Sequence, residues 1–277
     1  EFENKWRFKI SAEIYKQLGD YSYPYVSFYL YNKPNFSLAD RPSIVSYNFN
    51  EPSTLFNGMI SPLIPYTMKG VVWYQGENNA FRHEEYGELF SLLISDWRSK
   101  WDNDFSFYYV QIAPYFNYYN SNAPLREVQR KALEVPKTGM VVTLDIGEKY
   151  DIHPSNKHDV GFRLARYALK NDYKIDLIDS GPLYMSQSIH ENVIKVFFKH
   201  LGDGLVLDEN RYSEFEVAGI DKKYFVADVV NQNDFLEVFS DNVKNPLYVR
   251  YAWSDTSSAS LFNSEGLPAS SFNTENE

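Results

Sequence analysis

Hydrophobic and polar positions between residues 68 and 170 follow two alternating patterns. Short apolar runs, typical of strands buried in a sheet, are separated by stretches in which apolar residues recur at every third or fourth position, typical of a helix with one buried face. The runs that predict strands cover residues 68–76, 107–113 and 139–146, and the stretches that predict helices cover residues 84–101, 124–133 and 158–170. A strand followed by a helix, three times in succession, predicts an α/β fold with a doubly wound parallel sheet.

The pattern changes after Gly181 and Pro182. From there, short β-type runs separated by polar turns predict an antiparallel β-rich region, with strands at residues 192–198, 215–218, 224–230, 235–239 and 247–253. We therefore expect an α/β domain in residues 1–180 and a β-rich accessory region in residues 181–277. Near the two ends, residues 11–19 predict a short helix in an otherwise irregular segment, and the polar residues 270–277 predict a loose tail.

Composition and charge exclude several classes of function. Hydrophobic residues make up 44% of the chain, which predicts a globular protein, and aromatic residues make up 17%, which favours core packing over sugar-stacking surfaces. The formal charge of -10 at pH 7 argues against nucleic-acid binding, because affinity for phosphates rests on clustered Lys and Arg. The absence of cysteine excludes disulfides, thiolate zinc sites and cysteine nucleophiles. No apolar run reaches the roughly 18 residues that a membrane span needs.

His153 is the histidine whose surroundings best suit catalysis. In parallel sheets, function lies at the carboxyl ends of the strands, and His153 follows the third predicted strand between Asp151 and Pro154. A histidine that acts as a base needs an acceptor on its far ring nitrogen, and Asp151 is available for that role. A turn in which these residues merely cap the next helix is an equal alternative on spacing alone. The other histidines lie at helix starts or near turns: His83, His158, His190 and His200.

A second polar group follows the first predicted strand. Its side chains include amides that can donate hydrogen bonds to a developing oxyanion, although each residue is also common in turns: Gln75, Gly76, Glu77, Asn78 and Asn79. Oxygen ligands for a cation are present at Asp145, Glu148 and Asp151, but this loop lacks the glycine at a sharp turn that calcium sites favour. We therefore expect neither a metal nor a cofactor.

At these two groups the sequence resembles the sialate O-acetylesterases, which are SGNH-type serine esterases. The resemblance covers residues 54–275 in ordered blocks: Leu55 to Tyr66, Gly70 to Glu77, Asp96 to Arg98, Val110 to Ala113, Leu125 to Gln129, Thr138 to Gly147, Asp151 to Pro154, Val249 to Trp253 and Gly266 to Phe272. It implies an SGNH-hydrolase-like fold, a secreted or periplasmic location, and removal of acetyl groups from sialic acid or a related sugar through a serine acyl-enzyme. It also implies that His153 and Asp151 are catalytic and that Gln75 to Asn79 line the substrate pocket, with Asn78 or Asn79 near the oxyanion. The family commonly has Ser where this chain has Asn78.

The family's nucleophilic serine has no counterpart in this sequence. The family carries it in a Gly-Gln-Ser-Asn-Met block upstream of the stretch at Leu55, and the nearest similar segment, Gly19-Asp20-Tyr21-Ser22, has Tyr21 in place of the serine. The chain also begins at Glu1 without methionine or a signal peptide, as expected of a processed or cut product or a tag remnant. We therefore expect the first strand and its nucleophile loop on an N-terminal segment of the same protein, present as a separate chain. Two alternatives remain open: a non-catalytic carbohydrate-binding relative, and an esterase that acts on acetylated xylan- or pectin-type glycans.

Overall fold

The computed structural model describes residues 53–119, 121–208 and 214–276. The helix expected at residues 11–19 lies outside these ranges. The chain divides into two units, residues 1–60 and 61–277. The described part of the first unit contains a π-helix at Phe56–Ile60, and all that follows concerns the second unit.

A parallel sheet of three strands begins the second unit. Strands β1 (Gly70–Trp73), β2 (Ser106–Val110) and β3 (Thr138–Val141) lie in the order β1-β2-β3, each pair parallel. They confirm the three strands expected from the apolar runs. The central strand β2 is buried along its whole length, as the unbroken run of apolar residues indicated.

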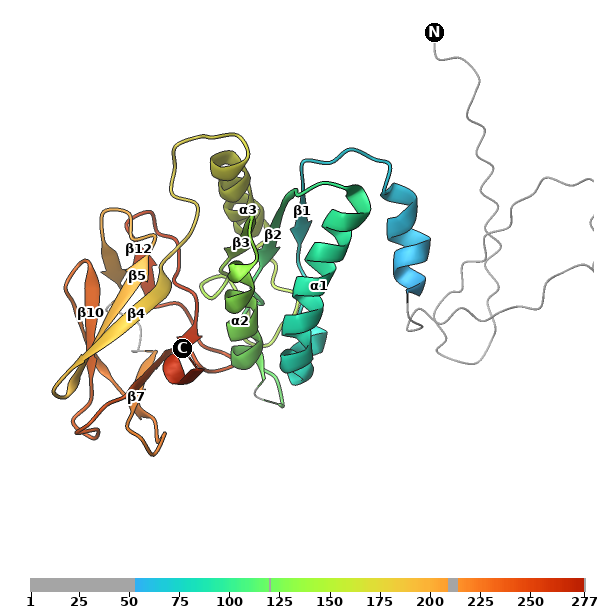
Figure 1. Cartoon of the computed structure of the whole chain (residues 1–277). Helices are drawn as coiled ribbons and strands as arrows, with labels where there is room; N and C mark the ends of the chain where they lie inside the picture. Colours follow the sequence, from blue (N-terminus) through green and yellow to red (C-terminus); the bar gives the residue numbers. More distant parts are fainter. Residues whose placement is uncertain (1–52, 120, 209–213, 277) are drawn as a thin grey trace, which may run out of the picture. The chain divides into compact units, whose positions relative to one another are not determined.

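Helices cover both faces of this sheet (Figure 1). They are α1 (His83–Trp101), α2 (Asn122–Lys131) and α3 (Lys157–Asn171), each within two residues of its predicted bounds. Because side chains alternate along a strand, Phe107 packs in one apolar cluster with Phe90 of α1, whereas Tyr108 packs in a second cluster with Tyr167 of α3. The α/β architecture is therefore as expected, with a helix layer on each side of the sheet.

The β-rich region consists of antiparallel sheets, as predicted. One sheet has the order β4 (Leu183–His190), β5 (Val193–Lys199), β10 (Phe235–Phe239) and β9 (Asp228–Asn231). A second has the order β13 (Phe272–Asn273), β11 (Tyr248–Tyr251), β7 (Phe215–Ala218) and β8 (Phe225–Val226). A two-stranded sheet pairs β12 (Leu261–Asn263) with β6 (Leu205–Leu207).

The expectation of a loose tail is wrong for residues 270–276. Strand β13 pairs with β11, and Phe272 is fully buried, with its ring stacked 4.9 Å from that of Tyr184. Ser270 is buried as well, and its hydroxyl oxygen accepts a hydrogen bond of 2.8 Å from Gln111 Nε2 at the end of β2. The segment looked solvated because its serines are polar, but these serines are bonded inside the protein.

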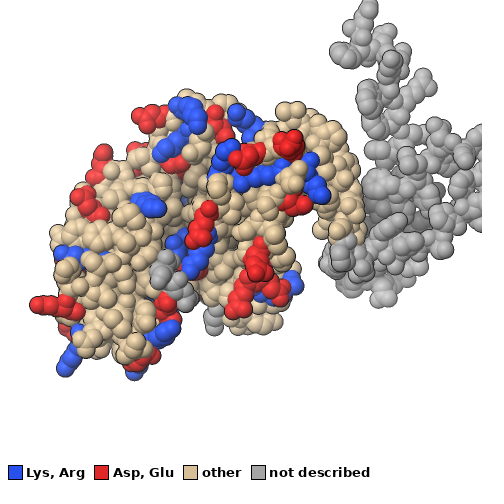
Figure 2. Space-filling model, viewed as in Figure 1, with Lys and Arg blue, Asp and Glu red and all other residues tan. Residues whose placement is uncertain are grey.

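A single apolar cluster contains Phe107 and Met140 of the parallel sheet together with Ile194 and Phe272 of the β-rich region. The division between an α/β domain at 1–180 and an accessory region at 181–277 therefore stays a prediction. On the face seen in Figure 2, acidic and basic residues are interspersed over the described surface. No helix in the described ranges has both the length and the apolar character to cross a membrane.

Candidate active site

The loops that follow the three parallel strands are joined at one edge of the sheet. The backbone N–H of Phe116, after β2, donates a hydrogen bond of 2.7 Å to the carbonyl of Lys149, after β3. The Tyr115 hydroxyl lies 3.4 Å from the carbonyl oxygen of Glu77, after β1. The loops after β2 and β3 approach so closely that a Cβ atom at Gly147 would lie 2.8 Å from the carbonyl oxygen of Pro114, so only glycine fits there. The two segments expected to carry function, after β1 and β3, are therefore held together through the loop after β2.

The loop after β1 presents amide groups on a fixed backbone. Gln75 Nε2 donates to Asn79 Oδ1 at 2.7 Å, and the Gln75 carbonyl accepts a bond of 3.1 Å from the Tyr86 hydroxyl. Gly76 is buried, and a Cβ there would lie 2.7 Å from Ile112 Cγ2, so a larger residue would displace this packed side chain. Asn78 is exposed, and the bond from Gln75 occupies the Asn79 side-chain oxygen rather than its nitrogen. The amide nitrogens of both asparagines are therefore available as donors.

Gln129 of α2 ties the ends of β1 and β2 together. Its side chain is almost completely buried, and its Oε1 accepts a hydrogen bond of 2.9 Å from the Ile112 amide. Its Nε2 lies 3.3 Å from the carbonyl oxygen of Val110 and 3.4 Å from that of Gln75. A buried glutamine that bonds both strand ends fixes the backbone on which Gln75 to Asn79 sit.

In the loop after β3, Asp151 bonds the backbone of His153 rather than its ring. Asp151 Oδ1 accepts a hydrogen bond of 2.8 Å from the His153 backbone N–H, and both residues are exposed. Within the described residues, the His153 imidazole makes no hydrogen bond of its own. The cap of α3 is Asn156, whose side-chain oxygen accepts from the Asp159 amide at 3.1 Å, so the capping role does not fall to Asp151, His153 or Pro154. The catalytic assignment of His153 and Asp151 stays a prediction.

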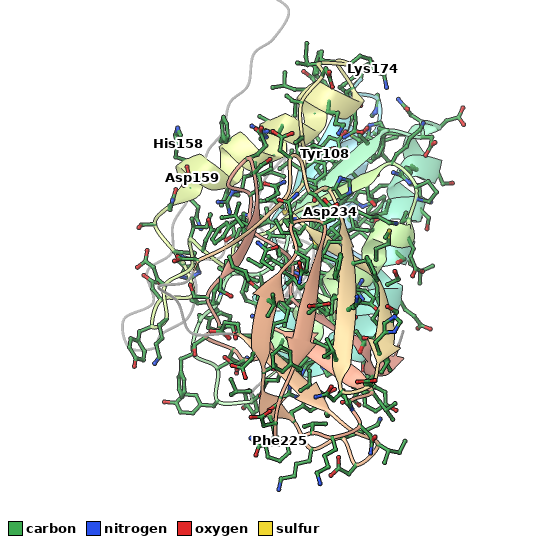
Figure 3. All side chains as sticks on the ribbon, turned by 90° about the vertical axis from the view of Figure 1, so that its left-hand side faces the viewer. Tyr108, His158, Asp159, Lys174, Phe225 and Asp234 are labelled. Carbon is green, nitrogen blue, oxygen red and sulfur yellow. The ribbon has the colours of Figure 1, made fainter. Side chains whose placement is uncertain are left out.

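The carboxylate of Asp145 is held by Arg163. Arg163 Nη1 donates to Asp145 Oδ1 and to the Val142 carbonyl, each at 2.7 Å, so this aspartate anchors α3 to the end of β3. Where the structure describes the chain, no group of three or more His, Asp or Glu residues is arranged to hold a metal ion. His158 is also paired: its Nδ1 lies 3.1 Å from Asp159 Oδ1 at the start of α3, where Figure 3 shows the two residues side by side.

The start of α3 also lies against the end of β1. Lys157 Nζ is 4.8 Å from the ring centroid of Tyr74, a cation–π contact. Burial raises the pKa of the Tyr74 hydroxyl to about 12, and the negative charge of Glu77 adds to this shift. Tyr74 is therefore un-ionised at neutral pH, and it links the two loops that carry Gln75 to Asn79 and His153.

Residues of the β-rich region complete the support behind these loops. Asp255 Oδ1 accepts a hydrogen bond of 2.8 Å from the Asn122 amide, and the Asp255 carbonyl accepts one of 3.1 Å from the Tyr115 amide. Arg126 of α2 is completely buried and donates to the carbonyls of Ala252 at 3.0 Å and Ser254 at 2.6 Å. Asn122 and Asp255 are 133 positions apart, so sequence spacing gave no signal for this contact.

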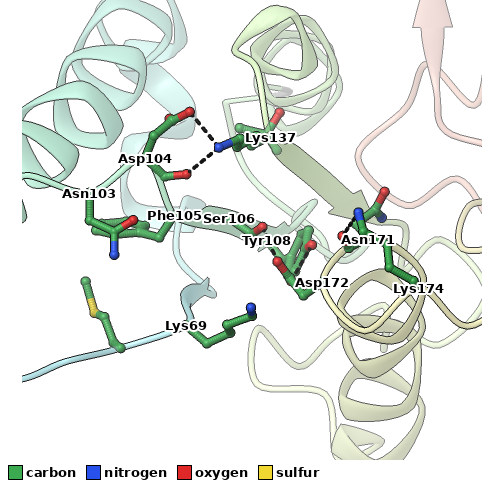
Figure 4. A pocket seen from close by; sticks show the side chains of 12 residues that line it. Lys69, Asn103, Asp104, Phe105, Ser106, Tyr108, Lys137, Asn171, Asp172 and Lys174 are labelled. Carbon is green, nitrogen blue, oxygen red and sulfur yellow. Dashed lines mark hydrogen bonds and ion pairs between the residues drawn. The ribbon is translucent and has the colours of Figure 1, made fainter.

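A separate cavity of about 530 Å³ opens at the opposite end of the parallel sheet, where the strands begin (Figure 4). Its charged groups are largely paired: Lys137 Nζ lies 2.8 Å from Asp104 Oδ2, and Asp172 accepts hydrogen bonds of 2.7 Å from the hydroxyls of Ser106 and Tyr108. No histidine lines this cavity. We therefore place the candidate site at the carboxyl edge, although this cavity lies at the other end.

We expect Ser155→Ala to raise the pKa of Glu148. That pKa lies below its ordinary value because the carboxylate accepts hydrogen bonds from the Ser155 amide at 2.7 Å and from the Ser155 hydroxyl at 2.8 Å. A lowered carboxyl pKa adds stability above the unfolded-state value and loses it as the pH falls through the folded-state value. The variant keeps the amide bond and loses the hydroxyl bond, so the pKa should rise part of the way. A ¹³C NMR titration of the Glu148 carboxyl would measure this, and an unchanged pKa would contradict the hydroxyl bond.

Comparison with known proteins identifies relatives over this site. Residues 43–170 match the family described as carbohydrate esterase, sialic acid-specific acetylesterase. The sialate O-acetylesterase of Mus musculus is 33% identical over 165 residues, which are 51% of this chain and 30% of that protein. The sialate O-acetylesterase of Homo sapiens is 31% identical over 154 residues, which are 47% of this chain and 29% of that protein. The crystal structure of a carbohydrate acetylesterase from Xanthomonas citri superposes with a TM-score of 0.76 at 37% identity, covering 80% of this chain and 54% of that one. The match thus spans less than a third of the curated relatives and about half of the solved structure.

Proposed function

We propose that this chain is a member of the sialate O-acetylesterase family and forms the histidine-bearing part of an enzyme that removes acetyl groups from a sugar. One observation carries the proposal: the loops joined at the carboxyl edge of the sheet carry both His153, whose ring makes no hydrogen bond to the residues that the structure describes, and the amide donors of Asn78 and Asn79. Such an edge is where α/β folds bind small molecules. The substrate that fits the family is an O-acetylated sialic acid or a related acetylated sugar.

In the proposed reaction, His153 acts as the general base. It accepts the proton of a serine hydroxyl while the serine oxygen attacks the acetyl carbon, and it then donates that proton to the departing sugar oxygen. A water molecule next attacks the acyl-serine, again with His153 as base, and acetate leaves as the serine regains its proton. The amide nitrogens of Asn78 and Asn79 are the candidate donors to the oxyanion of both tetrahedral intermediates.

Asp151 contributes to this scheme by fixing the loop. Its carboxylate bonds the His153 amide at 2.8 Å, and so sets the backbone from which the imidazole projects. Glu148 stabilises the other end of the same loop through Ser155. In the proposal, the second oxygen of Asp151 bonds the imidazole once the serine and the substrate are in place.

The nucleophilic serine comes, in this proposal, from an N-terminal segment of the same protein that is present as a separate chain. The support is the sequence itself, because the Gly-Gln-Ser-Asn-Met block of the family does not occur among its 277 residues. A cut in an exposed loop leaves a packed fold intact, so a nicked enzyme remains assembled. A secreted or periplasmic location belongs to the same proposal.

A serine-reactive fluorophosphonate probe tests the whole scheme on the protein purified from its natural source. We expect one labelled polypeptide that carries Gly-Gln-Ser-Asn and co-purifies with this chain, and we expect acetate release from an O-acetylated sialoside. Intact mass spectrometry identifies both polypeptides. Without labelling and without acetate release, the non-catalytic carbohydrate-binding alternative would replace the proposal. Acetate release from acetylated xylan but not from the sialoside would show that the substrate is a xylan- or pectin-type glycan.

A further inference from the structure

Each of the three loops at the candidate site exposes aromatic rings to solvent. Phe81 follows β1, Phe116, Tyr118 and Tyr119 follow β2, and Tyr150 follows β3. Their exposed fractions run from 49% for Phe116 to 88% for Tyr118. We call these five residues the aromatic rim. Exposed clusters of large apolar side chains in soluble proteins mark binding surfaces, because water is displaced from them at a gain in free energy.

The rim is ordered rather than a chance scatter of rings. The ring centroids of Phe81 and Tyr119 lie 6.2 Å apart and so join the loops after β1 and β2, and those of Phe116 and Tyr118 lie 5.2 Å apart. Asn117 stiffens the turn between them, since its Oδ1 accepts from the Tyr119 amide at 3.1 Å. The backbone bond between Phe116 and Lys149 connects these rings to the loop that carries Tyr150.

The rim also borders the candidate catalytic residues. Tyr150 directly precedes Asp151, and Phe81 lies two positions after Asn79. The two loops that carry the rim and the candidate base are joined by the bond between Phe116 and Lys149. The rim therefore lies on the same loops as the candidate site.

The chemistry of the rim fits a sugar chain better than a protein or a lipid. Protein interfaces also use aromatic side chains, but the core of such an interface is depleted of charged residues, whereas this edge carries Glu77, Glu148 and Asp151. Surfaces that lie in a bilayer interface combine apolar side chains with many Lys and Arg, which this edge does not have. A pyranose has a flat face of C–H groups and an edge of hydroxyls, so one sugar ring satisfies an aromatic face and a neighbouring amide together. Nucleic-acid bases also stack on aromatic rings, but their phosphates need a surface with an excess of positive charge. This edge has no such excess, because Arg82, Lys149 and Lys157 are balanced by three carboxylates: Glu77, Glu148 and Asp151.

We propose that the aromatic rim binds the sugar residues that flank the acetylated one, so that the enzyme acts on an oligosaccharide in preference to a single sugar. This inference rests on the proposed function and adds to it the length of the substrate. Tyr118 and Tyr119 carry most of the exposed ring surface on the stiffened turn. They are therefore the residues to replace.

The test compares O-acetylated sialyllactose with O-acetylated free sialic acid, using the complete natural protein. We expect a lower KM for the trisaccharide, and we expect Tyr118→Ala together with Tyr119→Ala to raise that KM about tenfold while leaving the KM for the single sugar within about twofold. Tyr66→Ala together with Tyr173→Ala is the matched control, because those tyrosines are 75% and 62% exposed but lie at the opposite end of the sheet. Equal KM values for the two substrates in the unmodified enzyme, or a preference that survives the double substitution, would overturn the inference.

Binding without catalysis separates this inference from the proposed function. Isothermal titration of the same proteins with de-acetylated sialyllactose needs no serine and no ester. Loss of affinity in the Tyr118 and Tyr119 variant supports sugar binding by the aromatic rim even if no acetate is ever released. Unchanged affinity, or no binding by the unmodified protein, counts against the rim even if the esterase is active.

Discussion

Replacing His153 with alanine is expected to lower acetate release by about a thousandfold or more, which is the usual cost of removing one member of a catalytic triad. The side chain is exposed and its ring makes no hydrogen bond to the residues that the structure describes, so the free energy of unfolding should hardly change. Initial rates of acetate release, with thermal unfolding measured in parallel, give both quantities. Full activity in the variant would end the assignment of His153 as the base.

Two matched substitutions make this prediction specific. His158→Ala removes a nearby imidazole that is exposed and paired with Asp159, and it should leave the rate within about twofold of the unmodified enzyme. Asp151→Asn keeps an oxygen that accepts from the His153 amide but removes the negative charge. A rate close to normal in this variant would limit Asp151 to fixing the loop, whereas a large loss would show that its charge acts on the imidazole.

Replacing Arg126 with alanine is expected to lower the free energy of unfolding by about 3–5 kcal/mol, the range observed when one partner of a buried charged network is removed. Arg126 is completely buried and donates hydrogen bonds to the carbonyls of Ala252 and Ser254 and to the Ser271 hydroxyl. Ala252 and Ser271 are buried and lose this partner in the variant, whereas the exposed Ser254 can bond water instead. The variant also leaves Asp255 without a neighbouring positive charge, and burial already raises the pKa of that carboxyl. Urea denaturation followed by fluorescence measures the loss.

Arg82→Ala is the control for this second prediction. Arg82 is an exposed arginine whose guanidinium lies 5.2 Å from the Phe81 ring centroid, so its replacement should change the free energy of unfolding by less than about 0.5 kcal/mol. A loss below about 1 kcal/mol for Arg126→Ala would mean that water enters and replaces its bonds. The hydrogen bonds from Arg126 of α2 to the β-rich region would then contribute less to the free energy of unfolding than their geometry indicates.

The strands and helices of the α/β part were predictable because their apolar residues recur with a clear period. Strand β4 was not, since its side chains alternate poorly between buried and exposed and its pairing with β5 shifts between Tyr184 and Ser186. The burial of Ser270 and Ser271 could not be foreseen either, because a serine gives no sign of whether its partner is water or Gln111.

The location of the candidate site was predictable from the sequence, but the hydrogen bonds within its loops were not. That His153 and Gln75 to Asn79 lie at one edge follows from the rule that parallel strands end together. Which atom Asp151 bonds, by contrast, depends on the fold of a loop whose turn is set by Glu148 and Ser155. The support from Asp255 depends on a contact between parts of the chain that only tertiary structure brings together.

The short strand β13 has a consequence for how the protein is made. Gln111 Nε2, at the end of the central parallel strand, donates to the Arg126 carbonyl at 3.0 Å and gains its second acceptor only when Ser270 arrives. Phe272 fills a core that also contains Phe107. The α/β part therefore cannot complete its interior while residues 270–276 are still inside the ribosome. Folding of the whole unit should finish only after synthesis has passed residue 276, and until then a nascent chain exposes apolar surface of the kind that chaperones bind.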